Sequence, residues 1–465
     1  MVETLPFDIR FQYALHTTSF NEQPLNDRSL GRFRARCNVY EESTGIDLIY
    51  HCITSLSAEV AQMMHLNSSM RRMDSLMVAS NIKKMSRLEL FYTCVANLCK
   101  LMAKREDSNL PKSLQHYLED GDHNGSLVLK KTFSDMNASI LEDGDHNTVL
   151  YHNRSEDTAS KTDQVLADAT ILKNACNDEY DQTSEYQLLI RVMSEQTTID
   201  HNGSLVLKKA SSDMNASILQ NPADSDATYR KKAGKEYQGY IANVVELADD
   251  KASIVVDYQF EQNTYSDSEC LKDYINRQPE GNESATLVTD GGYCGNDNAK
   301  MANGKNIRLV TTDLKGKAVS DIWADFKFSE DGTELIKCAG GYSPKSSVYD
   351  KNTEKCKASF PIQVCQNCPC FEQCKPILHK RVATSKVAQR TAYHAEQQRF
   401  IGTDEYKELS HYRNGVETVP AALRKRHHID KMPVKGKIKC GLYFGFKVAA
   451  MNVRKLVKYM SSLDT

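Results

Sequence analysis

Asp290 is the first of three acidic residues whose positions suit metal-dependent chemistry. It ends the apolar, β-branched run 287–289 and is followed by two glycines, Gly291 and Gly292. This pattern predicts a strand that carries a carboxylate to the edge of a sheet, where α/β proteins present metal ligands. A D-G-G sequence after a strand is also an ordinary turn, because paired glycines adopt backbone angles that other residues avoid. The pattern alone leaves both interpretations open.

Asp74 is the second candidate, because it interrupts the short apolar run 73–78. A carboxylate inside a buried strand costs free energy unless a cation or hydrogen bonds compensate its charge. One interpretation makes Asp74 a metal ligand. The other makes it the partner of Arg71 or Arg72 in an ion pair at the end of the strand.

Glu417 is the third candidate and lies in a segment with helical spacing, residues 411–428. Arg413 stands four residues before it and Arg424 seven residues after it. On a helix these three side chains share one face. An acid between two arginines is therefore expected on one side of a helix near the end of the chain.

The backbone around Glu417 carries two further signals. Asn414 is placed to cap a helix in which Glu417 is the third residue. Pro420 is expected to kink or restart that helix, because proline lacks the backbone N–H. Lys425 and Arg426 follow, and such basic side chains suit contacts with phosphates.

Six cysteines are concentrated in residues 321–375, and four of them form the pattern C-x2-C-P-C-x3-C. Cys365, Cys368 and Cys374 have the local spacing of zinc knuckles, in which one tight turn aims two thiolates at a tetrahedral ion. A fourth ligand would come from Cys338, Cys356 or Cys370. The alternative is that these are free thiols, buried or at the surface.

The composition is that of an ordinary globular chain, with 40% hydrophobic and 26% charged residues in 465. No apolar run is long enough to cross a bilayer, and the opening residues lack the apolar core of a signal peptide. Fourteen cysteines without an export signal point to reduced thiols in a cytosol. The net charge of -2 hides an asymmetry, because residues 376–465 hold 18 Lys and Arg but only 7 Asp and Glu. This basic end suggests a polyanionic partner, although basic ends also occur for solubility alone.

The elements that must position these residues alternate between strands and helices. Residues 1–69 are expected to form a helical domain resembling a DNA-binding domain, in which Arg32 and Arg34 either contact phosphates or lie on a solvated helix face. Residues 70–320 are expected to form the first part of an α/β core with a mixed sheet flanked by helices. The remaining expected divisions are a helical insertion at about 83–235, a cysteine-rich insertion at 321–375 and a basic last part of the core at 376–465.

A repeat lies inside the first insertion. The sequence D-H-N-G-S-L-V-L-K-K at 122–131 recurs at 200–209, and S-D-M-N-A-S-I-L ends both copies, at 134–141 and 212–219. Two unevenly placed copies do not make a solenoid. We expect a local duplication of about 23 residues, with residues 125–147 forming a poorly packed excursion that has no chemistry of its own.

Taken together, these stretches resemble bacterial insertion-sequence transposases, in the branch with a helical domain before an RNase H-like core. The resemblance covers most of the chain outside 106–160, and each stretch is weak alone, whereas their order is specific. Two departures are a first part that looks shorter than in the family and the duplication, which falls between the first two core strands. The tyrosine often found three residues before the arginine of the R-x3-E-x6-K/R motif is also absent, because position 410 is serine. The stretches that carry the resemblance are the cysteine insertion and residues 72–82, 85–90, 219–240, 287–293, 413–426 and 444–456.

The resemblance implies that Asp74, Asp290 and Glu417 form a DDE triad that cleaves transposon ends and transfers them into target DNA. Three carboxylates held together repel one another unless divalent cations neutralise them, and oxygen ligands suit Mg²⁺ or Mn²⁺. Zinc is expected only in the cysteine-rich insertion. The implied partners are terminal-repeat and target DNA, with a dimer on DNA, no membrane, and a bacterial, nucleoid-associated cytoplasmic location. The side chains expected to contact DNA are Arg413, Arg424, Lys425, Arg426, Arg32 and Arg34.

Two other functions remain compatible with the sequence. One is a transposase-derived protein that binds DNA but has lost catalysis. The other is a zinc-stabilised interaction protein in which the three acids are incidental. Nicking of DNA in the presence of Mg²⁺ distinguishes the first function from both.

Overall fold

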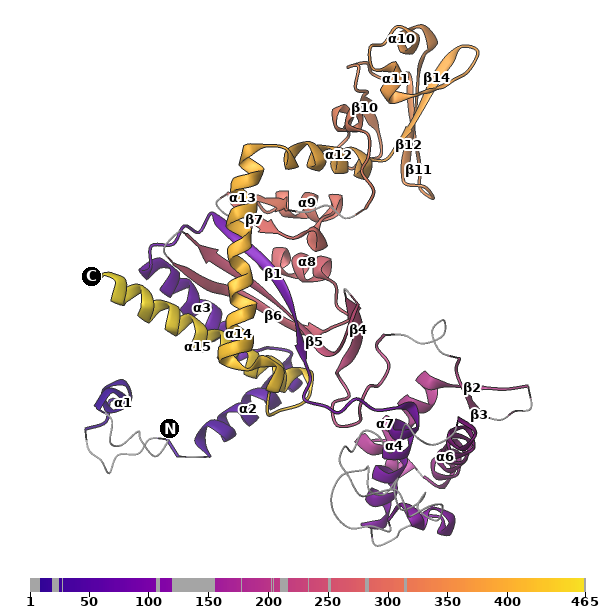
Figure 1. Cartoon of the computed structure of the whole chain (residues 1–465), viewed down its shortest axis with the longest axis vertical. Coiled ribbons are helices and arrows are strands. Elements are labelled where there is room, and N and C mark those ends of the chain that lie inside the picture. Colours follow the sequence, from indigo (N-terminus) through magenta and orange to yellow (C-terminus); the bar gives the residue numbers. More distant parts are fainter. Residues whose placement is uncertain are drawn as a thin grey trace.

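The computed structural model has a central sheet, with a helical cluster at one end of the molecule and the cysteine-rich insertion at the other (Figure 1). A long helical rod crosses the sheet between them. None of the helices in the described part of the chain is both long and apolar enough to cross a membrane. The structure describes residues 9–18, 25–26, 28–105, 109–118, 155–176, 178–201, 203, 205–209, 216–232, 234–249, 252–280, 284–312 and 316–463.

The central sheet is built around β1 (Met70–Ala79). β1 pairs antiparallel with β5 (Lys235–Ala248), whose other edge pairs antiparallel with β6 (Ser253–Gln262). On its second edge β1 pairs parallel with β7 (Ala285–Thr289), which pairs parallel with β8 (Ile307–Thr311). Three antiparallel strands followed by two parallel ones, with the first strand in the centre, is the RNase H-like arrangement. The predicted fold class is therefore confirmed.

One face of the sheet is covered by the two helices that connect β6 to β7 and β7 to β8. α8 (Asp267–Arg277) leads from β6 to β7, and α9 (Asn296–Asn303) leads from β7 to β8. α8 begins with a capping box, in which Ser266 and Glu269 satisfy each other's backbone N–H groups. Apolar side chains of both helices pack against Met73 and its neighbours on the sheet. This packing fixes the ends of β1 and β7 relative to each other.

The opposite face is covered by helices from both ends of the chain. α2 (Ser29–Thr44) and α3 (Leu48–Met63) pack there with α15 (Lys437–Leu463). Their apolar side chains share one cluster with those of β5 and β6. The short α1 (Ile9–Ala14) precedes them. Within residues 1–69, which were predicted to be helical, α2 and α3 contribute to the same hydrophobic core as the sheet.

The helical insertion lies between β1 and β5, and most of its elements share a hydrophobic cluster of their own. Its first helix is capped by Ser86, whose hydroxyl accepts the Glu89 N–H while the Glu89 carboxylate accepts the Ser86 N–H. The prediction for 125–147 falls outside the described residues, as does the first repeat copy. The elements of the insertion are α4 (Arg87–Ala103), η2 (Lys112–Tyr117), α6 (Ser155–Ala175), η3 (Asp178–Tyr180), α7 (Ser184–Gln196), β2 (Thr197–Ile199), β3 (Leu205–Leu207) and β4 (Thr228–Lys232), the last of which pairs with β5.

The cysteine-rich insertion follows β8 and contains a four-stranded antiparallel sheet of order β11-β12-β14-β13. β14 lies beyond residue 375, at which the sequence analysis ended the insertion, and it pairs with β12 inside it. The elements are η5 (Asp321–Asp325), β9 (Lys327–Phe328), β10 (Leu335–Lys337), β11 (Ser346–Asp350), β12 (Lys355–Pro361), α10 (Ile362–Gln366), α11 (Phe371–Cys374), β13 (Ile377–Leu378), β14 (Val382–Val387) and α12 (Gln389–Ile401).

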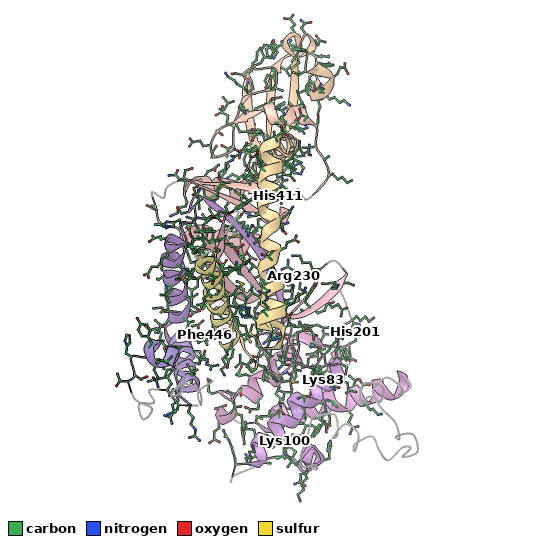
Figure 2. The ribbon with its side chains drawn as sticks, turned by 60° about the vertical axis from the view of Figure 1, so that its left-hand side comes forward. Lys83, Lys100, His201, Arg230, His411 and Phe446 are labelled. Atoms are coloured by element: carbon green, nitrogen blue, oxygen red, sulfur yellow. The ribbon has the colours of Figure 1, made fainter. Side chains whose placement is uncertain are left out.

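The long helical rod consists of three segments in succession. α13 (Asp404–Asn414) is continued by the 3-10 turn η6 (Gly415–Glu417) and by α14 (Thr418–His427). Figure 2 shows His411 on this rod, which runs beside the sheet. A last 3-10 turn, η7 (Ile429–Lys431), leads to α15. The rod carries Arg413 and Glu417 to the sheet.

Candidate active site

Asp74 lies in the middle of β1, and its side chain is 13% exposed. One carboxylate oxygen accepts the backbone N–H of Ser75 at 2.9 Å. Burial raises the pKa of Asp74 to about 6, the Arg413 guanidinium opposes this rise, and the nearby charge of Asp290 adds to it. Asp74 is therefore a buried acid with a second acid close by.

The two arginines that could have paired with Asp74 are engaged elsewhere. Arg71 donates to the Tyr274 hydroxyl and to Gln278, at 2.7 and 2.8 Å. Arg72 forms an ion pair with Glu246, its register partner on β5, at 2.7 Å. The interpretation of Asp74 as the partner of Arg71 or Arg72 is therefore wrong.

Asp290 directly follows β7, as the strand-then-glycine pattern predicts. The parallel register aligns Arg72 with Val288. Continuing both strands by two residues brings Asp74 beside Asp290. Asp290 also accepts the backbone N–H of Gly292 at 2.6 Å and so caps a 3-10 turn. Both interpretations of the D-G-G sequence therefore describe Asp290: it lies at the edge of the sheet, and it also caps the turn that follows.

Arg413 reaches the sheet from the end of α13 and lies between two carboxylates. Its Nη2 is 3.7 Å from the Oδ1 of Asp74, and its Nη1 is 3.9 Å from the Oε1 of Glu417. Its buried Nε finds no hydrogen-bond partner among the residues that the structure describes. The Glu417 side chain is 70% exposed, whereas that of Arg413 is only 16% exposed. The Arg413 guanidinium thus connects Asp74 of β1 to Glu417, the residue directly before α14.

The helix geometry around Glu417 differs from the prediction. Asn414 has helical backbone angles and forms no side-chain cap, so the helix does not begin there. The rod passes through η6 instead, and Pro420 lies in the first turn of α14, where a missing N–H costs little. Arg413 and Glu417 therefore share a face of the rod although the helix changes its winding between them.

Asp267 is an acid that the sequence analysis missed. Its side chain is 5% exposed, its Oδ1 accepts the Ser75 hydroxyl at 2.7 Å, and its Oδ2 lies 3.9 Å from the Nζ of Lys232. Oxygens of Asp267 and Asp290 both lie against Gly292, within 3 Å of the position that a Cβ there would take. In the sequence, S-D-S-E is fully explained as a helix start. Only the fold brings Asp267 to the acids of β1 and β7.

The donor atoms gathered here suit a hard divalent cation. They are carboxylate oxygens, which Mg²⁺ and Mn²⁺ prefer. Asp74 lies on β1, and Asp290 directly follows β7, the parallel neighbour of β1. Across the described ranges, however, no three His, Cys, Asp or Glu side chains lie close enough together to hold a metal ion. The positive charge between Asp74 and Glu417 is that of Arg413.

The other predicted DNA contacts differ in their availability. Arg424 donates to the Met77 carbonyl of β1 at 2.6 Å, and Arg34 donates to the Tyr443 hydroxyl and lies over its ring. These two arginines hold helices to the core. Lys425, Arg426 and Arg32 are exposed.

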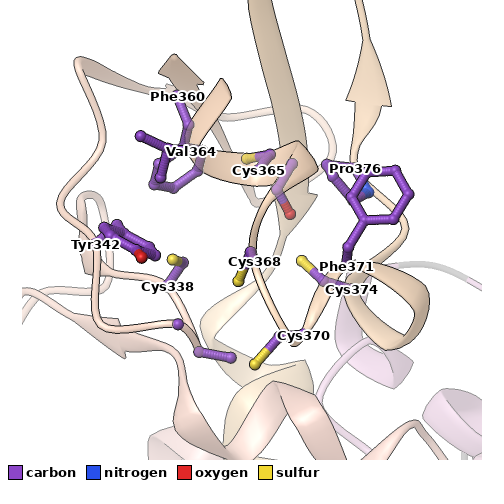
Figure 3. Close-up of a pocket in the computed structure, with 13 residues that line it drawn as sticks. Cys338, Tyr342, Phe360, Val364, Cys365, Cys368, Cys370, Phe371, Cys374 and Pro376 are labelled. Carbon is purple, nitrogen blue, oxygen red and sulfur yellow. The ribbon is translucent and has the colours of Figure 1, made fainter. Parts of the chain in front are cut away.

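The three cysteines named as zinc ligands lie near one another in the insertion. Together with Cys338 and Cys370 they line a pocket beside Tyr342 and Phe360 (Figure 3). Cys356 is buried elsewhere, and its thiol donates to the Gly332 carbonyl. Cys356 therefore belongs to the buried core beneath the pocket, whereas the other five cysteines of the insertion line the pocket itself.

Comparison with known proteins relates part of the chain to transposases. Residues 337–457 match a family model described as "Transposase DDE domain". The match contains the cysteine cluster, Arg413 and Glu417, but neither Asp74 nor Asp290. It supports a relationship to transposases, which cleave and transfer DNA.

Comparison with individual proteins adds little. No curated protein matches the chain. A solved structure with a weak overall likeness is the piggyBac transposase synaptic complex with hairpin DNA. It is 9% identical, covers 83% of this chain and 81% of its own, and gives a TM-score of 0.21.

Proposed function

We propose that this protein is a DDE-type DNA transposase of the bacterial insertion-sequence kind, which cleaves transposon ends and transfers them into target DNA. The observation that supports this most directly is Arg413, which contacts both Asp74 and Glu417 while Asp290 lies next to Asp74. Asp74 and Glu417 are more than 340 residues apart in the sequence. Burying Asp74 beside another carboxylate costs free energy, and a functional site accounts for that cost. The transposase-related match at 337–457 supports the same reaction class.

In this proposal Asp74, Asp290 and Glu417 hold Mg²⁺ or Mn²⁺. Such ions activate a water or a 3'-hydroxyl and stabilise the leaving oxygen of an in-line phosphoryl displacement. Asp74 and Asp290 are fixed by the sheet, whereas Glu417 is exposed and free to turn inward once Arg413 withdraws from Asp74. Arg413 would then meet a DNA phosphate, to which a guanidinium can donate two parallel hydrogen bonds. Asp267 would remain the partner of Ser75 and Lys232 and keep the loop after β7 in place.

DNA is the proposed partner, with a dimer assembled on the two transposon ends and the bacterial nucleoid as the place of action. Lys425 and Arg426, exposed on α14 between two and three turns beyond Glu417, are positioned to contact the phosphates that flank the cleaved bond. Arg32 would extend the contact over α2. Arg424 and Arg34 are more occupied, because each already holds a helix to the core.

A second candidate is a transposase-derived DNA-binding protein without catalysis. The observation that favours it is the Arg413 guanidinium, which lies between Asp74 and Glu417 and supplies there the positive charge that a metal ion would otherwise provide. Such a protein would bind the same DNA through the same basic residues.

The test is a nicking assay on a plasmid that carries the DNA flanking the gene, with Mg²⁺ or Mn²⁺. We expect Asp74→Asn, Asp290→Asn and Glu417→Gln each to reduce nicking by at least a thousandfold while DNA binding in a gel-shift assay stays within about twofold of the wild type, because the carboxylates act on the metal rather than on the DNA. Glu408→Gln is the control, since Glu408 is an exposed acid on α13. Wild-type nicking by a variant would remove its residue from the site. A wild-type protein that shifts the DNA but never nicks it is the non-catalytic candidate.

A further inference from the structure

The cysteine-rich insertion has a small hydrophobic core for its size. Its buried cluster consists of six side chains, with partly buried residues packed around them, among them Cys338, Cys365 and Cys374. Small β-rich units that bury little apolar surface commonly depend on a metal ion or disulfides for their stability. The position of the cysteines beside this core therefore needs an explanation.

Cys338 lies in a tight turn of the segment C-A-G-G-Y. Its N–H donates to the Tyr342 carbonyl at 2.9 Å, and its own carbonyl accepts the N–H of Gly341 at 2.8 Å. Gly341 adopts a positive φ of 80°, which allows the chain to reverse so closely. The turn presents the Cys338 thiol to the pocket.

The second group of cysteines comes from the segment after β12. Cys365 lies in the last turn of α10, and its carbonyl accepts the Cys368 N–H at 3.1 Å. Cys374 ends α11, whose chain is reversed by Lys375 in a left-handed conformation. The cysteines of this segment thus lie on two short helical turns, and their thiols lie on the side of the turn of Cys338 (Figure 3).

The two groups are in direct contact through Gly340. The Cys368 sulfur lies 2.8 Å from the position that a Cβ of residue 340 would take. A side chain at this position would therefore push Cys368 away from Cys338. The absence of a side chain at 340 allows the two turns to approach each other.

The electrostatic neighbours distinguish the members of the cluster. Burial first, and then the charges of Cys338, Cys365 and Cys368, raise the pKa of Cys374 to about 11, while a hydrogen bond with Ser385 lowers it. The pKa of Cys365 is raised by burial and by Cys338 and Cys368. Cys338, Cys365, Cys368 and Cys374 therefore lie close to one another around the pocket.

We propose that Cys338, Cys365, Cys368 and Cys374 form a structural zinc site that joins the turn of Cys338 to the segment after β12. Two ligands from one C-x2-C turn and two from separate turns suit the tetrahedral geometry of zinc. Each thiol that binds gives its proton to solvent, and no oxidant or reductant takes part. The four side chains must rotate inward to close on the ion, because they do not lie close enough together in the described structure. Cys370 lies beside Cys368 and Cys338, at the bottom of the cluster in Figure 3, whereas Cys374 lies beside Cys338, Cys365 and Cys368; Cys370 is not a ligand in this proposal.

Zinc bound in this way would fix the insertion as a rigid unit without relying on its core. The proposal does not depend on DNA cleavage, because the ligands lie outside the carboxylate site and the ion has no open position for substrate. A protein that never nicks DNA would still bind zinc here.

The test is the zinc content of the purified full chain and of five variants. We expect one zinc per chain in the wild type and in Cys370→Ser, and near-complete loss in Cys338→Ser, Cys365→Ser, Cys368→Ser and Cys374→Ser. Cys370→Ser is the matched control, because this cysteine belongs to the same turn. A wild type purified without zinc that also fails to bind added zinc would overturn the proposal. So would equal loss of zinc in Cys370→Ser and Cys338→Ser.

A second measurement on the wild type alone avoids variants that fail to fold. Alkylation of the full chain followed by mass spectrometry should find Cys338, Cys365, Cys368 and Cys374 protected by zinc and reactive after chelation. Cobalt in place of zinc should give the visible absorption of a tetrahedral thiolate site. Disulfides among these four cysteines, or protection that includes Cys370 and omits Cys338, would contradict the assignment.

Discussion

Asp74 carries the largest electrostatic cost among the proposed site residues. Its carboxylate is largely buried on a central strand, and its one ion-pair partner among the described residues is Arg413, at 3.7 Å, while Lys232 acts on it more weakly. That distance is longer than a hydrogen bond, so the compensation is incomplete and its pKa stays raised. A carboxylate whose charge is only partly compensated would be stabilised further by a divalent cation.

We expect Asp74→Asn to stabilise the protein at neutral pH. The pKa of Asp74 rises from its ordinary 3.8 to about 6, so the native state holds a proton where the unfolded chain has lost it. The stability that this proton provides is complete below about pH 4 and is lost as the pH rises through about 6. Asparagine avoids the loss, and the variant should be more stable than the wild type at pH 8 by up to about 3 kcal/mol. Urea unfolding in the presence of a chelator at pH 5 and pH 8 measures the difference.

The control for this experiment is Asp404→Asn, an acid that is almost fully exposed at the start of α13. Its effect should stay within about 0.5 kcal/mol at both pH values. An Asp74→Asn variant that is less stable than the wild type at pH 8 would show that the carboxylate is better compensated than its surroundings indicate.

Sequence patterns found two of the candidate acids because each is marked by its own strand. Their adjacency could not be predicted from those patterns, since it depends on the parallel register of β1 and β7. Glu417 was singled out by helical spacing and by a family resemblance, and neither predicts that Arg413 reaches across to β1. Asp267 was missed because its local role as a first-turn acid already accounts for it.

At the scale of elements, Arg72 determines how closely the rod approaches the sheet. It is buried, forms an ion pair with Glu246, and donates from Nη1 to the Tyr412 carbonyl at 2.8 Å. Glu246 is held in turn by Lys455 of α15. A Cβ on Gly415 would lie 2.1 Å from the same Nη1. The glycine of the R-N-G-V-E sequence therefore allows the contact that sets Arg413 and Glu417 beside β1.

We expect Gly415→Ala to displace the rod from β1. Arg72 would have to leave the Tyr412 carbonyl, which loses a buried hydrogen bond and should cost about 2 kcal/mol of unfolding free energy. Nicking should fall at least tenfold, because small displacements of a catalytic group are costly. Gly402→Ala at the end of α12 is the control, since the nearest atom to its Cβ would be an ordinary 3.5 Å away. Equal effects of the two substitutions would contradict this role of Gly415.

The rod also marks the limit of secondary-structure prediction here. A helix over 411–428 was predicted, and helical turns do cover most of that range. The predicted cap at Asn414 is wrong because the helix starts ten residues earlier, at Asp404. A local capping pattern cannot signal that a helix already passes through it.

At the scale of the whole molecule, α15 closes the hydrophobic core. This end of the chain is basic in composition, yet one face of the helix is buried against α3 and β6. Asn452 lies on that face and bonds to both backbone groups of Val255 and to the Ser57 hydroxyl. Charge counts do not reveal such a face, because they do not show on which side of a helix each residue lies, and one of its lysines, Lys455, reaches inward to the buried Glu246.

We expect Asn452→Ala to destabilise the protein by about 3 kcal/mol, because it leaves the N–H and the carbonyl of Val255 buried without partners. Val457→Ala, on the exposed side of the same helix, should change the stability by less than about 0.5 kcal/mol. Urea unfolding of the full chain compares the two. Similar values would mean that α15 contributes to the core less than its burial indicates.

The repeated segment has a consequence for the helical cluster. In the copy at 200–219, Leu205 and Leu207 form β3 opposite β2, and Leu219 is buried among the helices. The copy at 122–141 encodes the same leucines. The two copies differ only at residues 132–133 and 210–211. In the copy at 200–219, a truncation such as Leu219→Ala would open a cavity inside the helical cluster itself, so the repeated sequence is part of what holds these helices together.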